Sequence, residues 1–253
     1  MENSINPAKP IQRVLLVIAM HAEAMPIVDV LKLTQADSAI FPKGVPWIRY
    51  TGSLEGLFDI DVVVPGKCPI FGVDNVGTVP LALATFAAIQ ALQPDLVINA
   101  GTAGGFKAKG ACVGDVFLAT QVAYHDRRIP IPIFDTYGIA TTKCTPVPNM
   151  IAALGFKEGN LSTGNSLDMT QQDEQLIKSN DASIKDMEGA AVVYVTNLLS
   201  VPAILLKSVT DIVDGVRPTT EEFLENLSTA AVALLKTVVM ALKFVHGKTV
   251  TEL

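Results

Sequence analysis

Apolar runs alternate with amphipathic stretches along the whole chain, and this alternation most constrains how the chain can fold. Five runs rich in branched residues are predicted to be strands: 13–19, 58–64, 94–101, 114–120 and 201–209. Three longer stretches are predicted to be helices: 78–92, 188–199 and 219–246. Strands that alternate with helices indicate an α/β fold, here a three-layer α/β/α sandwich with a mixed, largely parallel central sheet.

The composition agrees with this class of fold. Of the 253 residues, 49% are hydrophobic and 17% are charged, as expected where strands are buried on both faces. No linker, low-complexity segment or internal repeat divides the chain. We therefore expect a single domain over residues 1–253, with residues 1–12 as a flexible N-terminal tail.

Charge, hydropathy and cysteine usage exclude several classes of function. The formal net charge is −6 and no segment is dense in lysine or arginine, so nucleic acid is not an expected partner. The longest uncharged apolar stretches are too short or too interrupted to span a membrane, and the N-terminus lacks a signal-peptide core. Three widely spaced cysteines and three scattered histidines predict free thiols in the cytoplasm and no metal site.

Three acidic residues lie at the ends of predicted strands. Glu23 is early in the helix after the first strand, Glu188 follows a further apolar run, and Asp211 comes directly after the strand at 201–209. Each acid alone fits a structural role as a first-turn acid or a helix N-cap. Ligands of α/β sheets bind at the carboxyl ends of strands, so three separate acids at that edge favour a shared catalytic site.

A glycine-rich segment, 98–106, is expected to form a turn after the third predicted strand. Its small residues would let backbone N–H groups approach an anion or a hydroxyl, and a tight turn without a ligand is the structural alternative. Its spacing matches neither the GxGxxG dinucleotide fingerprint nor the GxxxxGK(S/T) phosphate loop. A Rossmann dehydrogenase is therefore excluded, and no cofactor is expected.

Four segments in this order resemble the 5′-methylthioadenosine/S-adenosylhomocysteine nucleosidases of the nucleoside phosphorylase superfamily: IAMHAEAMPI, INAGTAGGF, KDMEGAAVVYV and KSVTDIVDG. HDRRIPIP, LSTGNSLDM and RPTTEEFLENL are similar to the plant branch, and the resemblance covers about residues 13–246. It implies an N-glycosyl hydrolase that cleaves 5′-methylthioadenosine to adenine and the thioribose in methionine salvage. S-adenosylhomocysteine is a second candidate substrate.

The resemblance implies a division of labour among the acids. Asp211 would be the general acid that protonates adenine N7, supported by Ser208 or Thr210. Glu188 would bind the ribose hydroxyls, and Glu23 would position the attacking water. The other residues that the resemblance implies in substrate binding are Met187, Leu167, Asp168, Thr102, Ala103, Gly104 and Lys207.

Within that set, Met187 would pack on the ribose, while backbone groups of Leu167 and Asp168 would hold adenine. Three positions depart from the family pattern. Lys207 stands where bacterial members carry arginine, and Leu167 replaces an aromatic residue of those members. Asn165 stands where plant relatives have aspartate.

The resemblance also implies a homodimer, and segment 124–137 is the candidate interface because Ile129–Phe134 is rich in proline and large apolar residues. His125 next to Asp126 could suggest a nucleophilic triad, but the chain has no GxSxG motif to supply the serine.

Two alternative functions remain on the same fold. A purine nucleoside phosphorylase would need arginines aimed at phosphate, whereas the strand ends here offer Glu23, which would repel that anion. A non-catalytic storage or binding protein could lose its acids without losing its fold, yet all three acids are present.

Overall fold

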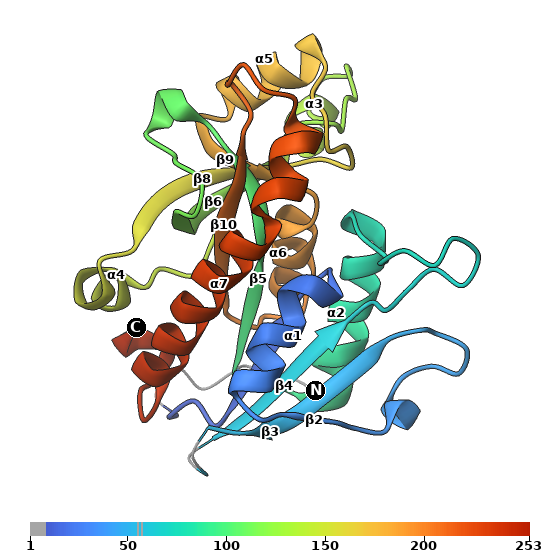
Figure 1. The fold of residues 1–253 in the computed structure, drawn as a ribbon, viewed down its shortest axis with the longest axis vertical. Coiled ribbons are helices and arrows are strands. Elements are labelled where there is room, and N and C mark those ends of the chain that lie inside the picture. The colour runs from blue at the N-terminus through green and yellow to red at the C-terminus, as the bar shows by residue number, and fades with distance from the viewer. Residues whose placement is uncertain (1–8, 55, 57) are drawn as a thin grey trace.

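The computed structural model describes residues 9–54, 56 and 58–253, so most of the predicted tail, 1–12, lies outside the described residues. A ten-stranded sheet runs through the molecule (Figure 1). Its strands are β1 (Arg13–Val17), β2 (Thr34–Gln35), β3 (Ile48–Ser53), β4 (Asp59–Val64), β5 (Leu96–Gly105), β6 (Val116–Tyr124), β7 (Thr142–Lys143), β8 (Lys157–Thr163), β9 (Ala182–Asp186) and β10 (Ala203–Ile212).

Helices connect and cover these strands. They are α1 (His21–Val30), α2 (Thr78–Leu92), α3 (Phe134–Ile139), α4 (Pro148–Leu154), α5 (Gln171–Ser179), α6 (Gly189–Leu198) and α7 (Thr219–Val245). Each of the five predicted strands and three predicted helices is present, with bounds shifted by a few residues.

The sheet is mixed. Strand β1 pairs in parallel with β4 and β5, β5 with β10, and β8 with β6 and β9, while the remaining pairings are antiparallel. Because β10 pairs with both β5 and β6, the strands β10, β6, β8, β9 and β5 close on themselves. This closure brings the ends of β5, β9 and β10 together.

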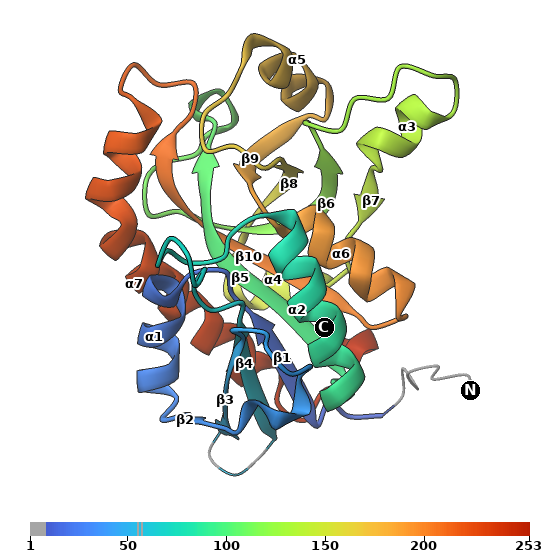
Figure 2. The same cartoon turned by 90° about the vertical axis from the view of Figure 1, so that its right-hand side faces the viewer.

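Side chains of β1 alternate between two hydrophobic clusters, which shows that both faces of the sheet are covered. Val14 and Leu16 pack in a cluster with α1, α4 and α7, whereas Leu15 and Val17 pack in a cluster with α2 and α6. Successive side chains of a strand point to opposite faces, so these clusters are separate layers. Figure 2 shows the sheet between these two groups of helices, which confirms the predicted sandwich.

The C-terminal helix α7 is long and apolar enough to cross a membrane by length and composition alone. Its apolar face is instead part of the protein interior, because Leu234, Val238, Ala241 and Leu242 are fully buried in the cluster beneath the sheet. Its other face carries exposed charged residues, among them Lys236 and Lys243. These features are those of a core helix.

Two expectations about strand ends are wrong in detail. The glycine-rich segment is not a turn, because β5 continues to Gly105 and pairs there with both β9 and β10. Asp211 does not follow its strand but lies inside β10, beside an irregularity in the pairing between Val209 and Asp211. Glycine allows this continuation, since a Cβ at Gly104 would lie 2.5 Å from a methyl carbon of Val213.

Candidate active site

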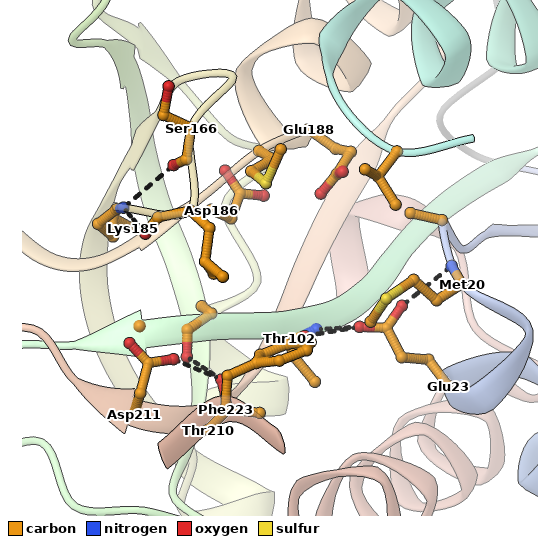
Figure 3. Close-up of a pocket in the computed structure, with 16 residues that line it drawn as sticks. Met20, Glu23, Thr102, Ser166, Lys185, Asp186, Glu188, Thr210, Asp211 and Phe223 are labelled. Atoms are coloured by element: carbon orange, nitrogen blue, oxygen red, sulfur yellow. Dashed lines mark hydrogen bonds between the residues drawn. The ribbon is translucent and has the colours of Figure 1, made fainter. Parts of the chain in front are cut away.

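A cavity of about 300 Å³ lies where β5, β9 and β10 end beside the first turn of α1 (Figure 3). All three predicted acids line it, although they come from distant parts of the chain. The lining residues are Ala19, Met20, Glu23, Val76, Thr102, Ala103, Gly104, Ser166, Leu167, Lys185, Asp186, Met187, Glu188, Thr210, Asp211 and Phe223.

Glu23 is held in place by hydrogen bonds from two elements. Its Oε1 accepts from the backbone N–H and the hydroxyl of Thr102, both at 2.7 Å, and its Oε2 accepts from the N–H of Met20 at 3.2 Å. The side chain is buried, and burial raises the pKa of Glu23 in spite of the bonds from Thr102 and the charge of Lys207. A fixed carboxylate of raised basicity is suited to accept a proton.

Glu188 is the N-cap of α6, but its side chain does not cap that helix. Its Oε1 instead accepts a 2.8 Å hydrogen bond from the N–H of Gly77, at the start of α2. Burial and the nearby charge of Asp186 raise the pKa of Glu188 to about 7, although Lys207 opposes the shift. The second oxygen remains available to a ligand hydroxyl.

Asp211 lines the cavity, and only one of its two carboxyl oxygens has a hydrogen-bond partner among the described residues. Its Oδ1 accepts a 2.7 Å hydrogen bond from the Thr210 hydroxyl, and its buried Oδ2 has no hydrogen-bond partner among the described residues. Burial raises the pKa of Asp211, while Thr210 and the charge of Lys185 limit the rise. Of the two predicted supporting residues, Thr210 contacts the acid, whereas the Ser208 hydroxyl has no partner in the described part of the chain.

Lys207 does not line the cavity but lies behind its wall, with its side chain 1% exposed. Its Nζ is 2.8 Å from Oδ2 of Asp186, which also accepts from the Gly189 N–H at 2.8 Å. The charges of Asp186, Glu188 and Glu23 keep the pKa of Lys207 raised against the lowering effect of burial. One buried cation therefore acts on three carboxylates. Sequence reasoning did not identify Asp186.

The segment between β8 and α5 forms one side of the cavity and departs from expectation at one residue. Leu167 lines the cavity as predicted, whereas Asp168 does not. The carbonyl oxygens of Ser166, Leu167 and Asp168 all accept hydrogen bonds from Nζ of Lys185. Lys185 was missed because a lysine next to an aspartate in sequence is usually a solvated residue.

The other predicted binding residues, Met187, Thr102, Ala103 and Gly104, all line the cavity. Sequence reasoning missed five further lining residues, which are Ala19, Met20, Val76, Ser166 and Phe223. Phe223 belongs to the first turn of α7, and Met20 precedes α1, so only the folded chain brings these apolar side chains together. They give the cavity an apolar portion next to its acids.

The departure at Asn165 has a structural consequence. Its Oδ1 accepts hydrogen bonds from the N–H and the hydroxyl of Thr78, both at 2.9 Å, and its own N–H groups donate to Oδ2 of Asp126. An amide can accept and donate in this way, whereas an aspartate side chain could not donate to Asp126. Asn165 thus joins the start of α2 to the segment after β8.

The features around His125 lie outside the cavity. His125 is buried and its Nδ1 is 3.1 Å from the hydroxyl of Ser162, which is fully buried as well. Neither residue lines the cavity, and no nucleophilic triad is formed there. Within the described residues, no cluster of histidine, cysteine and acidic side chains could hold a metal ion.

Comparisons with known proteins agree with the fold. The family profile of the phosphorylase superfamily matches residues 13–243. A 5′-methylthioadenosine/S-adenosylhomocysteine nucleosidase of Arabidopsis thaliana is 51% identical over 97% of this chain and 96% of its own length.

Solved structures agree as well. The apo form of an Arabidopsis thaliana 5′-methylthioadenosine nucleosidase superposes with a TM-score of 0.95 at 52% identity, over 97% of this chain and all of that one. A Colwellia psychrerythraea 5′-methylthioadenosine/S-adenosylhomocysteine nucleosidase in complex with adenine has a TM-score of 0.74 at 26% identity, over 94% of this chain and 98% of that one. This chain therefore belongs to the phosphorylase superfamily, and within it to the 5′-methylthioadenosine/S-adenosylhomocysteine nucleosidases.

Proposed function

We propose that this protein hydrolyses the N-glycosidic bond of 5′-methylthioadenosine and releases adenine and the thioribose. One observation carries the proposal: Glu23, Glu188 and Asp211 line a single cavity of about 300 Å³ in a chain 51% identical to a nucleosidase. Three separately held carboxyl groups can divide the work of protonating a leaving base, stabilising a cationic sugar and activating water.

In the proposed reaction, Asp211 delivers a proton to N7 of the purine as the bond between the anomeric carbon and N9 breaks. The electron pair of that bond leaves with the base. A carboxyl group can act as an acid near neutral pH only if its pKa is raised, and burial raises the pKa of Asp211. Oδ2 is the carboxyl oxygen without a hydrogen-bond partner among the described residues, so we assign the proton to it.

The other two acids act on the sugar and on the water. Positive charge builds on the ribose as the base leaves, and the Glu188 carboxylate, already anchored by Gly77, would accept hydrogen bonds from the ribose hydroxyls. Glu23 would orient a water below the anomeric carbon and take one of its protons. The water oxygen then bonds to that carbon, which completes the hydrolysis.

Apolar side chains of the cavity lining would contact the different parts of this substrate. Leu167 would cover the purine and Met187 the ribose. Met20, Val76 and Phe223 supply apolar surface for the thioether end. S-adenosylhomocysteine remains a second candidate substrate, and its turnover relative to 5′-methylthioadenosine would show whether the cavity accepts a charged tail.

The proposed setting is a cytoplasmic homodimer that acts in methionine salvage. Support for an interface comes from segment 124–137, where Ile131, Ile133 and Phe134 are 56%, 84% and 54% exposed. Ile133 also adopts a φ of 74°, which is costly for a β-branched residue. A neighbouring subunit that covers this apolar segment would offset the cost.

Release of adenine from 5′-methylthioadenosine, followed by absorbance with and without phosphate, tests the proposal. We expect release in phosphate-free buffer at a rate that added phosphate does not change, because no arginine lines the cavity in the described residues. Strict dependence on phosphate would instead identify a phosphorylase. No release from either nucleoside would identify a non-catalytic binding protein.

A further inference from the structure

Lys185 uses all of its hydrogen-bonding capacity on one short stretch of backbone. The residue lies in β9, is 4% exposed and lines the cavity (Figure 3). Its Nζ lies 3.2, 2.7 and 3.0 Å from the carbonyl oxygens of Ser166, Leu167 and Asp168. A lysine ammonium has three donors, so three consecutive carbonyls occupy them all.

This is an unusual environment for a lysine. Among the described residues, no carboxylate lies within ion-pair distance of its Nζ, whereas the more exposed Lys109 and Lys157 each form an ion pair with an aspartate. Burial lowers the pKa of Lys185, and the more distant charges of Asp211 and Asp168 oppose that shift. A buried ammonium without an ion pair is costly unless its hydrogen bonds replace those of water. The three carbonyls supply that replacement.

The sheet places Lys185 and Asp211 on either side of one glycine. Gly104 of β5 pairs with Lys185 of β9 and with Asp211 of β10. A Cβ at Gly104 would lie 2.9 Å from Oδ2 of Asp211 and 3.5 Å from Cγ of Lys185. The missing side chain lets the acid and the lysine both approach β5 closely. Ser166 and Leu167, whose carbonyls Lys185 holds, line the same cavity as the acid.

We propose that Lys185 is a positioning residue that holds the backbone of residues 166–168 in the orientation that binds the purine. The inference rests on the proposed function, because it takes adenine as the group bound between this backbone and Asp211. Carbonyls that converge on one ammonium fix the rotation of their peptide planes, and the N–H groups of those planes are fixed with them. Without Lys185 the planes could rotate, and binding would have to order them.

The test compares Lys185→Met with Lys157→Met, in which the same change is made at an exposed lysine of β8. Adenine binding is measured by calorimetry, and kcat and KM are measured with 5′-methylthioadenosine. We expect Lys185→Met to raise the Kd of adenine and the KM by at least ~10-fold with a smaller change in kcat. Lys157→Met should match the wild type in all three quantities.

Hydrogen exchange of the free protein gives a readout that does not depend on the substrate. Amides of residues 164–170 should exchange faster in Lys185→Met, while the core strands keep their protection. Faster exchange with unchanged adenine binding would overturn the positioning role, and so would unchanged exchange. If Lys185→Met does not fold, Lys185→Gln, which removes the charge and one donor, is judged by the same criteria. A wild-type protein that neither binds adenine nor hydrolyses the nucleoside would contradict the proposed function itself.

Discussion

Lys207 and Asp186 form an ion pair of 2.8 Å in which the side chains are 1% and 0% exposed. Asp186 lines the cavity and Lys207 lies behind its wall. Asp186 accepts further hydrogen bonds from Thr163 and Gly189. The positive charge of Lys207 also acts on Glu188 and Glu23, because it opposes the rise in the pKa of both carboxyl groups. The pair therefore links the stability of the fold to the charge state of the site.

Replacement of Lys207 by methionine should destabilise the protein severely. It leaves Asp186 as a buried charge without its partner, and the loss of a single partner from such a pair costs about 3–5 kcal/mol. The free energy of unfolding, measured with urea at pH 7, checks this value. Lys157→Met removes an exposed pair with Asp115 and should cost at most about 1 kcal/mol. Equal costs for the two variants would contradict the structural role of Lys207.

The stability of the wild type should fall as pH rises through 7, in part because of Glu188. Its folded-state pKa of about 7 is above the ordinary glutamate value, so the folded protein retains a proton that the unfolded chain releases. The contribution to stability is full below the unfolded pKa and is lost through the folded pKa. From pH 5 to 8, wild type should lose on the order of 3 kcal/mol more than Glu188→Gln. Parallel urea-denaturation profiles for the two proteins would show that Glu188 does not titrate in this range.

Gly104→Ala and Gly105→Ala form a matched pair that separates activity from stability. The added Cβ would lie 2.5 Å from Val213 and 2.9 Å from Oδ2 of Asp211 at position 104, but 2.7 Å from Ala111 at position 105. Both variants should lose about 1–3 kcal/mol of stability through overpacking. Only Gly104→Ala displaces the acid, so only its turnover, measured on folded protein, should fall by more than ~10-fold. A similar fall in both would mean that position 104 has no special relation to Asp211.

Sedimentation of Ile133→Glu tests the proposed interface. We expect a wild-type dimer, and a charge at this 84% exposed position should weaken dimerisation by at least ~10²-fold because it would be buried without a partner. Val30→Glu, at an exposed position of α1, should remain dimeric. A monomeric wild type, or a dimer that Ile133→Glu leaves intact, would remove segment 124–137 as the interface.

The sequence predicted the layers of this fold because buried strands and helices carry strong local patterns. Strand β1 and the first half of β10 are nearly continuous apolar runs, and α7 begins with threonine and acidic residues. Strand β3 was missed because its sequence, IRYTGS, has neither an apolar run nor clean alternation. It forms because β4 and β2 pair with it on either side.

Site residues could be predicted where the residue type alone indicates a chemical role. They could not be predicted where the role depends on tertiary contacts. Glu23, Glu188 and Asp211 were identified because acids at strand ends are unusual, and the cavity contains all three. The sequence predicts a turn at the glycines, because the close approach of Val213 and Asp211 to β5 that they allow depends on strand pairing. Lys185 and Phe223 gave no local signal, because the cavity residues beside which they lie are distant from them in sequence.

The central claim is that Asp211 supplies the proton that the departing purine needs. The most direct test is the rate of adenine release from 5′-methylthioadenosine by Asp211→Asn, compared with Asp214→Asn. Asp214 is a matched control because its carboxylate accepts from the N–H groups of Lys107 and Ala108 and does not line the cavity. We predict that Asp211→Asn lowers kcat by at least ~10²-fold while Asp214→Asn stays within about twofold of wild type. Near wild-type turnover by a folded Asp211→Asn protein would contradict the account.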